Sequence, residues 1–292
     1  RFEVNEHVAR WQHVTWTPPA FVKLDVGAAR ANTGAIDGDR SQGFGYWNLN
    51  AITPETDKTT HYFWAQARNF RTDEDWISDL FVDTTHEAFS EDLWIIGHQQ
   101  ANMDSGVTPD RIDINHDGAA LQAIRLLDGM INAEGAGEAV QAAEKGDPGM
   151  LTAEENETLT RTGPDTPMGR MMRRFWLPVA SAHQVAAPDG APLRTQLLGE
   201  HLVVFRDTDG NLGVLDEFCV HRRASLALGR NEEGGLRCLL HGWKFTCDGT
   251  IVETPNHKSA NVREKIKQPS YPVIEAGGMI WTYIGDPAKQ PP

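Results

Sequence analysis

The chain has 292 residues, 40% of them apolar, and its formal net charge at pH 7 is −14. An acidic chain of this kind is repelled by nucleic acid and by anionic membranes, and no apolar run approaches the roughly 20 residues that a membrane-spanning helix needs. The sequence therefore predicts a globular, cytoplasmic protein with neither kind of partner, and its length allows two domains.

The negative charge lies almost entirely in the first half of the chain. Residues 1–149 carry 11 Lys and Arg against 24 Asp and Glu, a net charge of −13, whereas residues 150–292 carry 16 against 17. Glycine-rich stretches lie at both ends of residues 135–149. The asymmetry predicts a first domain over residues 1–134, a linker over residues 135–149 and a second domain over residues 150–292.

The first domain begins with segments of strand character and continues with helices. We expect strands at residues 21–25, 43–51 and 59–68, then a long helix capped by Thr72, with a break near Thr84 left open. The apolar stripe expected on this helix consists of Ile77, Leu80, Phe81, Phe89, Leu93 and Ile96. A second helix carries Leu121, Ile124, Leu127 and Ile131. Strands followed by long helices predict an α+β domain in which helix packs on an antiparallel sheet.

The second domain is predicted to be all-β, with helix only at its start. Thr166 before Pro167 suits a helix N-terminus, since Thr caps helices and proline is tolerated in the first turn. The strands expected after it are residues 202–205, 212–216, 236–240 and 279–284.

Two short segments of this domain pair cysteine with histidine. They are Cys219-Val220-His221 and Cys238-Leu239-Leu240-His241, and they supply two thiolates and two imidazoles. In a Rieske [2Fe–2S] centre, two cysteines hold one iron and two histidines hold the other. The four residues are therefore our candidate cluster ligands.

Three other interpretations remain open at this point. A zinc site would more commonly pair like residues with like, a Cys219–Cys238 disulfide would leave the histidine spacing unexplained, and the residues could be unrelated buried thiols and histidines. Cys247, the third cysteine, has no ligand neighbour and is expected to be a small buried residue.

The ligand segments carry a family resemblance. His221-Arg222, Ala224-Ser225-Leu226 and His241-Gly242-Trp243-Lys244-Phe245 resemble the Rieske domains of aromatic-ring oxygenases, and residues 150–179 look like the start of a phthalate-type oxygenase component. Asp216, Glu217 and Arg222 lie near the first segment and are candidates for pairing around the ligands.

The first half resembles a different part of the same kind of enzyme. Residues 49–64 and the Glu-Asp motif at Asp92 look like the C-terminal, helix-grip catalytic part of vanillate-demethylase-like oxygenases. The resemblance implies that Asp92 is the carboxylate of a 2-His-1-carboxylate site for mononuclear Fe(II), the kind of site that leaves positions open for O₂. Without the resemblance, Asp92 would be a solvated acid on a helix rich in acids.

The histidine pair that completes such a site is missing. His86 and His98 each lie six residues from Asp92, about 240° around a helix, so they cannot share its face. We therefore treat all six histidines of the first half as non-ligands: His7, His13, His61, His86, His98 and His116. The family runs Rieske domain first, so the reversed order here predicts a fragment or fusion of two oxygenases.

The resemblance implies an oxidoreductase that passes electrons through a [2Fe–2S] cluster for O₂-dependent hydroxylation or O-demethylation of an aromatic acid. The implied partners are an NAD(P)H-dependent reductase or ferredoxin and further copies of the chain in a trimer-type ring. The alternative is a Rieske electron-transfer module without its own catalytic iron, which the missing histidine pair favours. A weaker third option is a binding module that docks a partner through its acidic half.

Overall fold

The computed structural model describes residues 7–35, 40, 43–104, 118–135, 153–255 and 260–292. Its N-terminal half is built on one antiparallel sheet in the order β1-β2-β3-β4. The strands are β1 (Val8–Thr17), β2 (Phe21–Arg30), β3 (Gly43–Pro54) and β4 (Thr60–Arg68). The sequence prediction missed β1, whose only fully buried side chain is Trp11, so its alternation of apolar and polar residues is weak.

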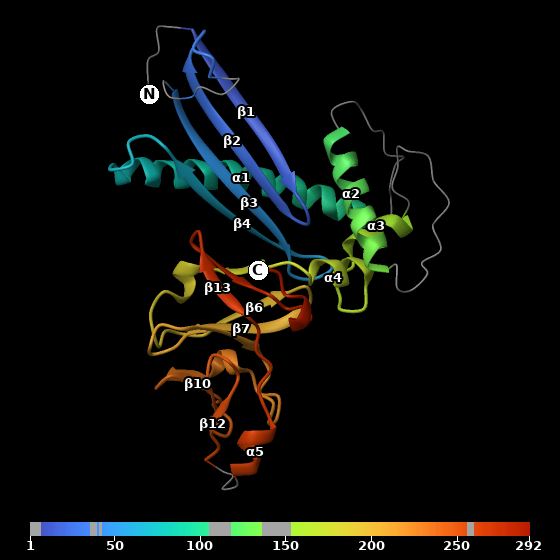
Figure 1. Cartoon of the computed structure of the whole chain (residues 1–292), viewed down its shortest axis with the longest axis vertical. Helices are drawn as coiled ribbons and strands as arrows, with labels where there is room; N and C mark the ends of the chain where they lie inside the picture. The colour runs from blue at the N-terminus through green and yellow to red at the C-terminus, as the bar shows by residue number, and fades with distance from the viewer. Residues whose placement is uncertain (1–6, 36–39, 41–42, 105–117, 136–152, 256–259) are drawn as a thin grey trace.

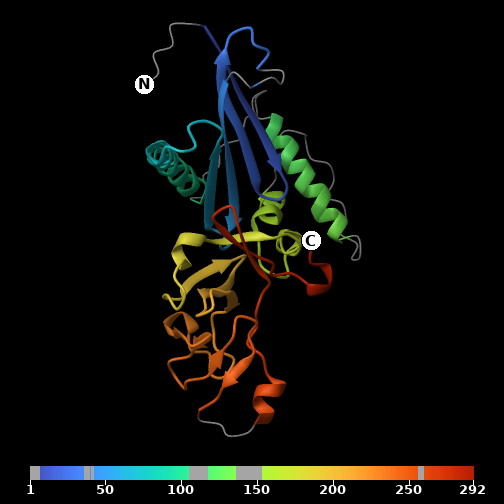
Figure 2. The same cartoon turned by 60° about the vertical axis from the view of Figure 1, so that its left-hand side comes forward.

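Two helices cover this sheet. Figure 2 shows α1 (Asp75–Asp104) and α2 (Gly118–Gly135) on opposite sides of it. The expected break in α1 is absent, because the helix runs unbroken past Thr84, whose hydroxyl donates to the Leu80 carbonyl at 2.7 Å. The helix begins at Asp75, so Thr72 is not its cap. Neither helix, nor any other among the described residues, is long and apolar enough to cross a bilayer.

The expected apolar stripe on α1 is only partly correct. The side chains that face the sheet recur every four residues, with Ile77 buried, Phe81 and Phe89 half-buried, and Phe81 edge-on to Tyr46 at 5.1 Å between ring centroids. Leu80, Leu93 and Ile96 are instead exposed. The stripe predicted from the sequence was wider than the face that this sheet covers.

The C-terminal half is a set of small antiparallel sheets, as expected for an all-β domain (Figure 1). It opens with α3 (Ala153–Thr160) and α4 (Pro167–Met172), where Thr166 caps α4 by accepting from the Gly169 N–H at 3.1 Å. The first strands are β5 (Leu177–Ser181), β6 (Leu193–Leu197), β7 (Glu200–Arg206) and β8 (Leu212–Asp216). The later strands are β9 (Arg230–Glu232), β10 (Gly235–Arg237), β11 (Lys244–Phe245), β12 (Ile251–Glu253), β13 (Val273–Ala276) and β14 (Met279–Thr282).

The domain has more strands than the sequence predicted, the last of them, β14, ends at Thr282 instead of Ile284, and two further details differ. β10 ends at Arg237 instead of Leu240, because the chain turns at the second cysteine–histidine segment. A helix, α5 (Ala260–Lys265), also occurs late in the domain. The predicted linker, after Gly135, lies outside the described residues, so the predicted domain boundaries stay predictions.

The two halves are joined by hydrogen bonds and by a shared apolar cluster. The N–H groups of Leu198 and Gly199 donate to the carbonyls of Pro54 and Glu55 at 2.9 and 2.7 Å, and the Thr162 N–H donates to Asp57 Oδ1 at 2.7 Å. Ala20 and Ile131 belong to a core otherwise formed by the second half. The halves therefore form one continuous body in which β10 and β12 lie far from the four-stranded sheet (Figure 1).

Candidate metal centre

The two cysteine–histidine segments form a matched pair of tight loops. In the first, the Cys219 N–H donates to the Ala224 carbonyl at 2.9 Å, and the Cys219 carbonyl accepts from the Arg223 N–H at 2.8 Å. In the second, the Cys238 N–H donates to the Trp243 carbonyl at 2.9 Å, and its carbonyl accepts from the Gly242 N–H at 3.0 Å. The two loops thus close on themselves in the same way, four and five residues after each cysteine.

The matching extends to the backbone conformation. The residue four places after each cysteine has a positive φ, 58° at Arg223 and 73° at Gly242. Glycine adopts this conformation readily, whereas a residue with a Cβ is strained in it. A Cβ at Gly242 would also lie 3.2 Å from Pro255 Cγ. The sequence signal for this second loop is therefore the His241-Gly242 pair, and the first loop has no glycine to mark it.

The loops place the two thiols together inside the domain. Cys219 and Cys238 are buried, at 1% and 2% exposure, and the Cys238 thiol lies within hydrogen-bonding reach of Cys219. Burial, and then the neighbouring thiol, raise the pKa of Cys219 to about 11, while the N–H groups of His221 and Arg222 oppose the rise by donating to its sulfur. Because thiolates bind metal and thiols do not, loading this site must release protons.

The two histidines meet at the outer side of the same site. The ring centroids of His221 and His241 are 4.6 Å apart, with the planes inclined at 67°. The His221 ring also stacks flat on Trp243 at 4.4 Å, which fixes its orientation. Two sulfurs on one side and two ring nitrogens on the other are the donor set that a Rieske cluster requires, so the residues fit that group.

The other interpretations of these residues, a disulfide and a zinc site, agree less well with the structure. All three cysteines are free thiols, so Cys219 and Cys238 are not joined as a disulfide. Within the described residues, no group of three or more His, Cys, Asp or Glu side chains is arranged to hold a single metal ion, as zinc would need. Cys247, expected to be buried, is only partly buried; its Sγ lies 3.4 Å from Asp207 Oδ2, and desolvation raises the pKa of its thiol to about 12.

Charged side chains form hydrogen bonds and ion pairs next to both ligand loops. Glu217 is buried at 2% exposure, where its carboxylate accepts from the Ser225 hydroxyl at 2.5 Å and pairs with Arg194 at 2.7 Å. Asp216 accepts the Phe218 N–H at 2.7 Å. Of the three residues singled out here, Asp216 and Glu217 bond to the residues that flank the first loop, whereas Arg222 is part of the loop itself.

The second loop is held by an ion network on β10, β11 and β12. Arg237 donates to the Gly242 carbonyl at 3.1 Å and to Glu253 at 2.9 Å, and Lys244 pairs with Glu233 at 3.3 Å. Arg237 and Lys244 are only 13% and 7% exposed. Hydrogen bonds from these two cations lower the pKa of the Glu253 carboxyl to about 2.

Asp92, the predicted mononuclear iron ligand, lies on α1 with an exposed side chain. Burial, and then the charge of Asp92, raise the pKa of Tyr62 on β4. His98 contacts the Trp94 carbonyl at 2.8 Å and His61 the Gln196 carbonyl at 2.9 Å, whereas His116 lies outside the described residues. The role of Asp92 stays a prediction.

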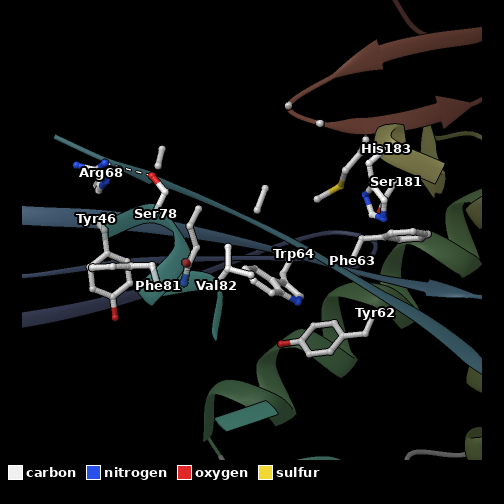
Figure 3. A pocket seen from close by; sticks show the side chains of 16 residues that line it. Tyr46, Tyr62, Phe63, Trp64, Arg68, Ser78, Phe81, Val82, Ser181 and His183 are labelled. Atoms are coloured by element: carbon white, nitrogen blue, oxygen red, sulfur yellow. Dashed lines mark hydrogen bonds between the residues drawn. The ribbon is translucent and has the colours of Figure 1, made fainter. Parts of the chain in front are cut away.

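Two cavities lie where the halves meet. One, of about 450 Å³, is lined by aromatic residues of β3, β4 and α1, with Arg68 and Ser78 bonded at one end and Ser181 and His183 at the other (Figure 3). The second, of about 920 Å³, lies beside Asp57 and Arg161. None of the five candidate ligands lines either cavity.

Comparisons with known proteins match the two parts of the chain separately. The family model of the Rieske [2Fe-2S] domain matches residues 175–272, and that of the vanillate O-demethylase oxygenase C-terminal domain matches residues 2–133. The crystal structure of dicamba monooxygenase bound to dicamba is 32% identical and covers 41% of this chain and 35% of its own, with a TM-score of 0.38.

Several curated relatives are oxygenase subunits. The phthalate 4,5-dioxygenase oxygenase subunit of Pseudomonas putida is 55% identical over 137 residues, which are 47% of this chain and 31% of that protein. The 5,5'-dehydrodivanillate O-demethylase oxygenase subunit of Sphingobium is 42% identical over 148 residues, 49% of this chain and 34% of that protein. The chain thus spans about a third of the length of these relatives. Its residues 175–272 are similar to a Rieske [2Fe–2S] domain and its residues 2–133 to a vanillate O-demethylase oxygenase C-terminal domain, and relatives of the chain are Rieske oxygenase subunits.

Proposed function

We propose that the chain acts in an oxygenase component, with Cys219, His221, Cys238 and His241 holding a [2Fe–2S] cluster. The observation that carries the proposal is the pair of matched loops that bring two thiols together inside and two imidazoles together outside. When bound, the cluster supplies one-electron transfer. The chain's own part is to bury the sulfurs, orient His221 against Trp243 and direct backbone N–H groups at Cys219.

The proposed overall reaction is O₂-dependent hydroxylation or O-demethylation of an aromatic acid. The names of the relatives support this substrate class, since they include phthalate, 3-chlorobenzoate and dehydrodivanillate enzymes. The proposed electron donor is an NAD(P)H-dependent reductase or a ferredoxin, and the proposed assembly is a trimer-type homo-oligomer. Free thiols suit a reducing compartment, so we propose a cytoplasmic location.

A second candidate is an electron-transfer module without a catalytic iron. The observation that favours it is the exposed position of Asp92, together with the lack, among the residues the structure describes, of any three side chains arranged for a single ion. In the oxygenase, Asp92 would be one ligand of mononuclear Fe(II). The two candidates therefore differ by one iron per chain.

The experiment that tests both is a measurement of iron and acid-labile sulfide per chain after anaerobic purification, on the wild type and on Asp92→Ala. Two iron and two sulfide in both proteins would support the electron carrier. Three iron to two sulfide in the wild type, with one iron lost in Asp92→Ala, would support the oxygenase. Iron without sulfide, or no iron, would reject the cluster.

A further inference from the structure

Gln268 is a fully buried side chain whose hydrogen bonds go to the backbone of the first ligand loop and of the residues that lead into it. Its side-chain Nε2 donates to the carbonyls of Asp216 at 2.8 Å and Phe218 at 3.1 Å. Its Oε1 accepts from the Val220 N–H at 2.7 Å. These contacts, at alternate residues, bracket Cys219 on both sides from a segment almost 50 residues further along the chain.

Gln268 is itself firmly placed between α5 and β13. Its side chain has 0% exposure, and its backbone N–H donates to the Gly249 carbonyl at 2.9 Å. Gly249 has φ +79°, and a Cβ there would lie 2.0 Å from the Gln268 carbonyl oxygen. The neighbouring turn therefore leaves Gln268 little freedom to move, as a residue that positions another segment needs.

The contact with Val220 fixes the backbone between two of the candidate ligands. Because the Val220 N–H donates to Gln268, the residue that separates Cys219 from His221 is held in place. Hydrogen bonds to the sulfurs are among the features that set the reduction potential of an iron–sulfur cluster. The second loop has a different brace, the charged Arg237 on the Gly242 carbonyl.

We propose that Gln268 is a positioning residue that raises the reduction potential of the cluster by holding the backbone on both sides of Cys219, so that the amides of the first loop keep their orientation toward the cluster. The inference rests on the proposed function, since it requires that the loop hold the cluster. Gln268 lies far from the ligands in sequence and has no ligand-like chemistry, so nothing local in the sequence marks it.

The test uses the full chain and two variants, Gln268→Leu, which removes all three hydrogen bonds at similar volume, and Gln268→Glu, which keeps an acceptor for Val220. Gln184→Glu is the control, because that exposed amide bonds only near Ser181. Redox titration followed by circular dichroism is expected to show a lower midpoint in Gln268→Leu. At the wild-type midpoint its reduced-to-oxidised ratio should fall about tenfold, which is about 59 mV for one electron.

A second measurement needs no cluster. In metal-free protein, hydrogen exchange of the Val220 amide should be at least about tenfold faster in Gln268→Leu, while the Leu226 amide, bonded to Glu217, should not change. Unchanged potential and unchanged Val220 exchange in folded variants would overturn the inference. If Gln268→Leu fails to fold, the same comparison is made on Gln268→Met, which also lacks the amide, whereas Gln268→Glu should keep Val220 exchange near the wild-type rate because it keeps the acceptor. A wild type that binds no iron and sulfide would instead reject the proposed function.

Discussion

The two halves of the molecule differ in how completely they bury their apolar side chains. In the C-terminal half, residues 150–292, the side chains of Leu202, Phe205 and Phe245 are fully buried within two extensive cores. Among the described residues of the N-terminal half, the one buried cluster that draws only on this half is small, comprising Trp11, Ala29 and Ala35. Its helix α1 exposes most of its large apolar side chains: Trp76, Leu80, Val82, Leu93, Trp94, Ile95 and Ile96.

This difference in burial indicates which half contributes more of the free energy of folding. Burial of apolar surface stabilises by about 25 cal/mol per Å², so the half with the filled cores carries most of that free energy. The N-terminal half depends more on the backbone hydrogen bonds of its own sheet. It also depends on the hydrogen bonds that its residues Pro54, Glu55 and Asp57 accept from the C-terminal half. The candidate cluster thus lies in the part of the molecule best able to hold a fixed geometry.

The largest expected effect is the loss of the cluster. Cys219→Ala removes a thiolate that no other residue of the site replaces, so cluster iron and acid-labile sulfide should fall to zero. Cys247→Ala is the matched control, because this thiol bonds to Asp207 outside the pair and the variant should keep its cluster. Equal iron loss in both variants would count against the assignment.

The next largest effect is the difference in stability lost when an apolar side chain is truncated in each half. Phe205→Ala removes a fully buried ring and should destabilise the chain by about 3–5 kcal/mol. Leu93→Ala removes a side chain that is 62% exposed and should change stability by less than about 0.5 kcal/mol. Urea unfolding of both variants measures the contrast, and a cost for Leu93→Ala close to that of Phe205→Ala would show that α1 is covered in solution.

Removing a hydrogen bond between the two halves should lower stability by a smaller amount. Asp57→Ala leaves the N–H of Thr162 without its acceptor, and Thr162 is only 2% exposed. An unmet buried donor costs about 1–3 kcal/mol. Lys58→Ala, at an exposed neighbouring position, should cost far less. Thermal unfolding of the pair tests this, and equal melting temperatures would mean that the contact contributes nothing.

The smallest expected effect is a dependence on acid. The pKa of Glu253 is lowered to about 2 in the folded chain by Arg237 and Lys244, so its stabilisation is complete above its ordinary pKa and is lost as the pH falls toward 2. Glu253 is 40% exposed, which limits the effect to less than about 1 kcal/mol. The gap in melting temperature between wild type and Glu253→Gln should close between pH 6 and 2. A constant gap would contradict this origin.

Local patterns in the sequence were sufficient for the parts of the structure that are locally determined. Thr166-Pro167 predicted a helix start, and the two cysteine–histidine segments do form neighbouring loops, whose role as cluster ligands stays a prediction. The pattern failed at Leu93 and Ile96, because periodicity cannot show how far the opposing sheet extends. It failed again at Gln268 and at the Glu217–Arg194 pair, where the partners are distant in sequence and only folding brings them together.

The most direct test of the central claim, that two cysteines and two histidines divide the irons between them, is pulsed electron paramagnetic resonance on the reduced protein grown with ¹⁵N-histidine. We predict couplings from two histidine nitrogens bound to iron, one of which disappears in His221→Cys and the other in His241→Cys, since a cysteine keeps an iron ligand at each position. The absence of any iron-bound nitrogen, or the persistence of both couplings in either variant, would contradict the assignment.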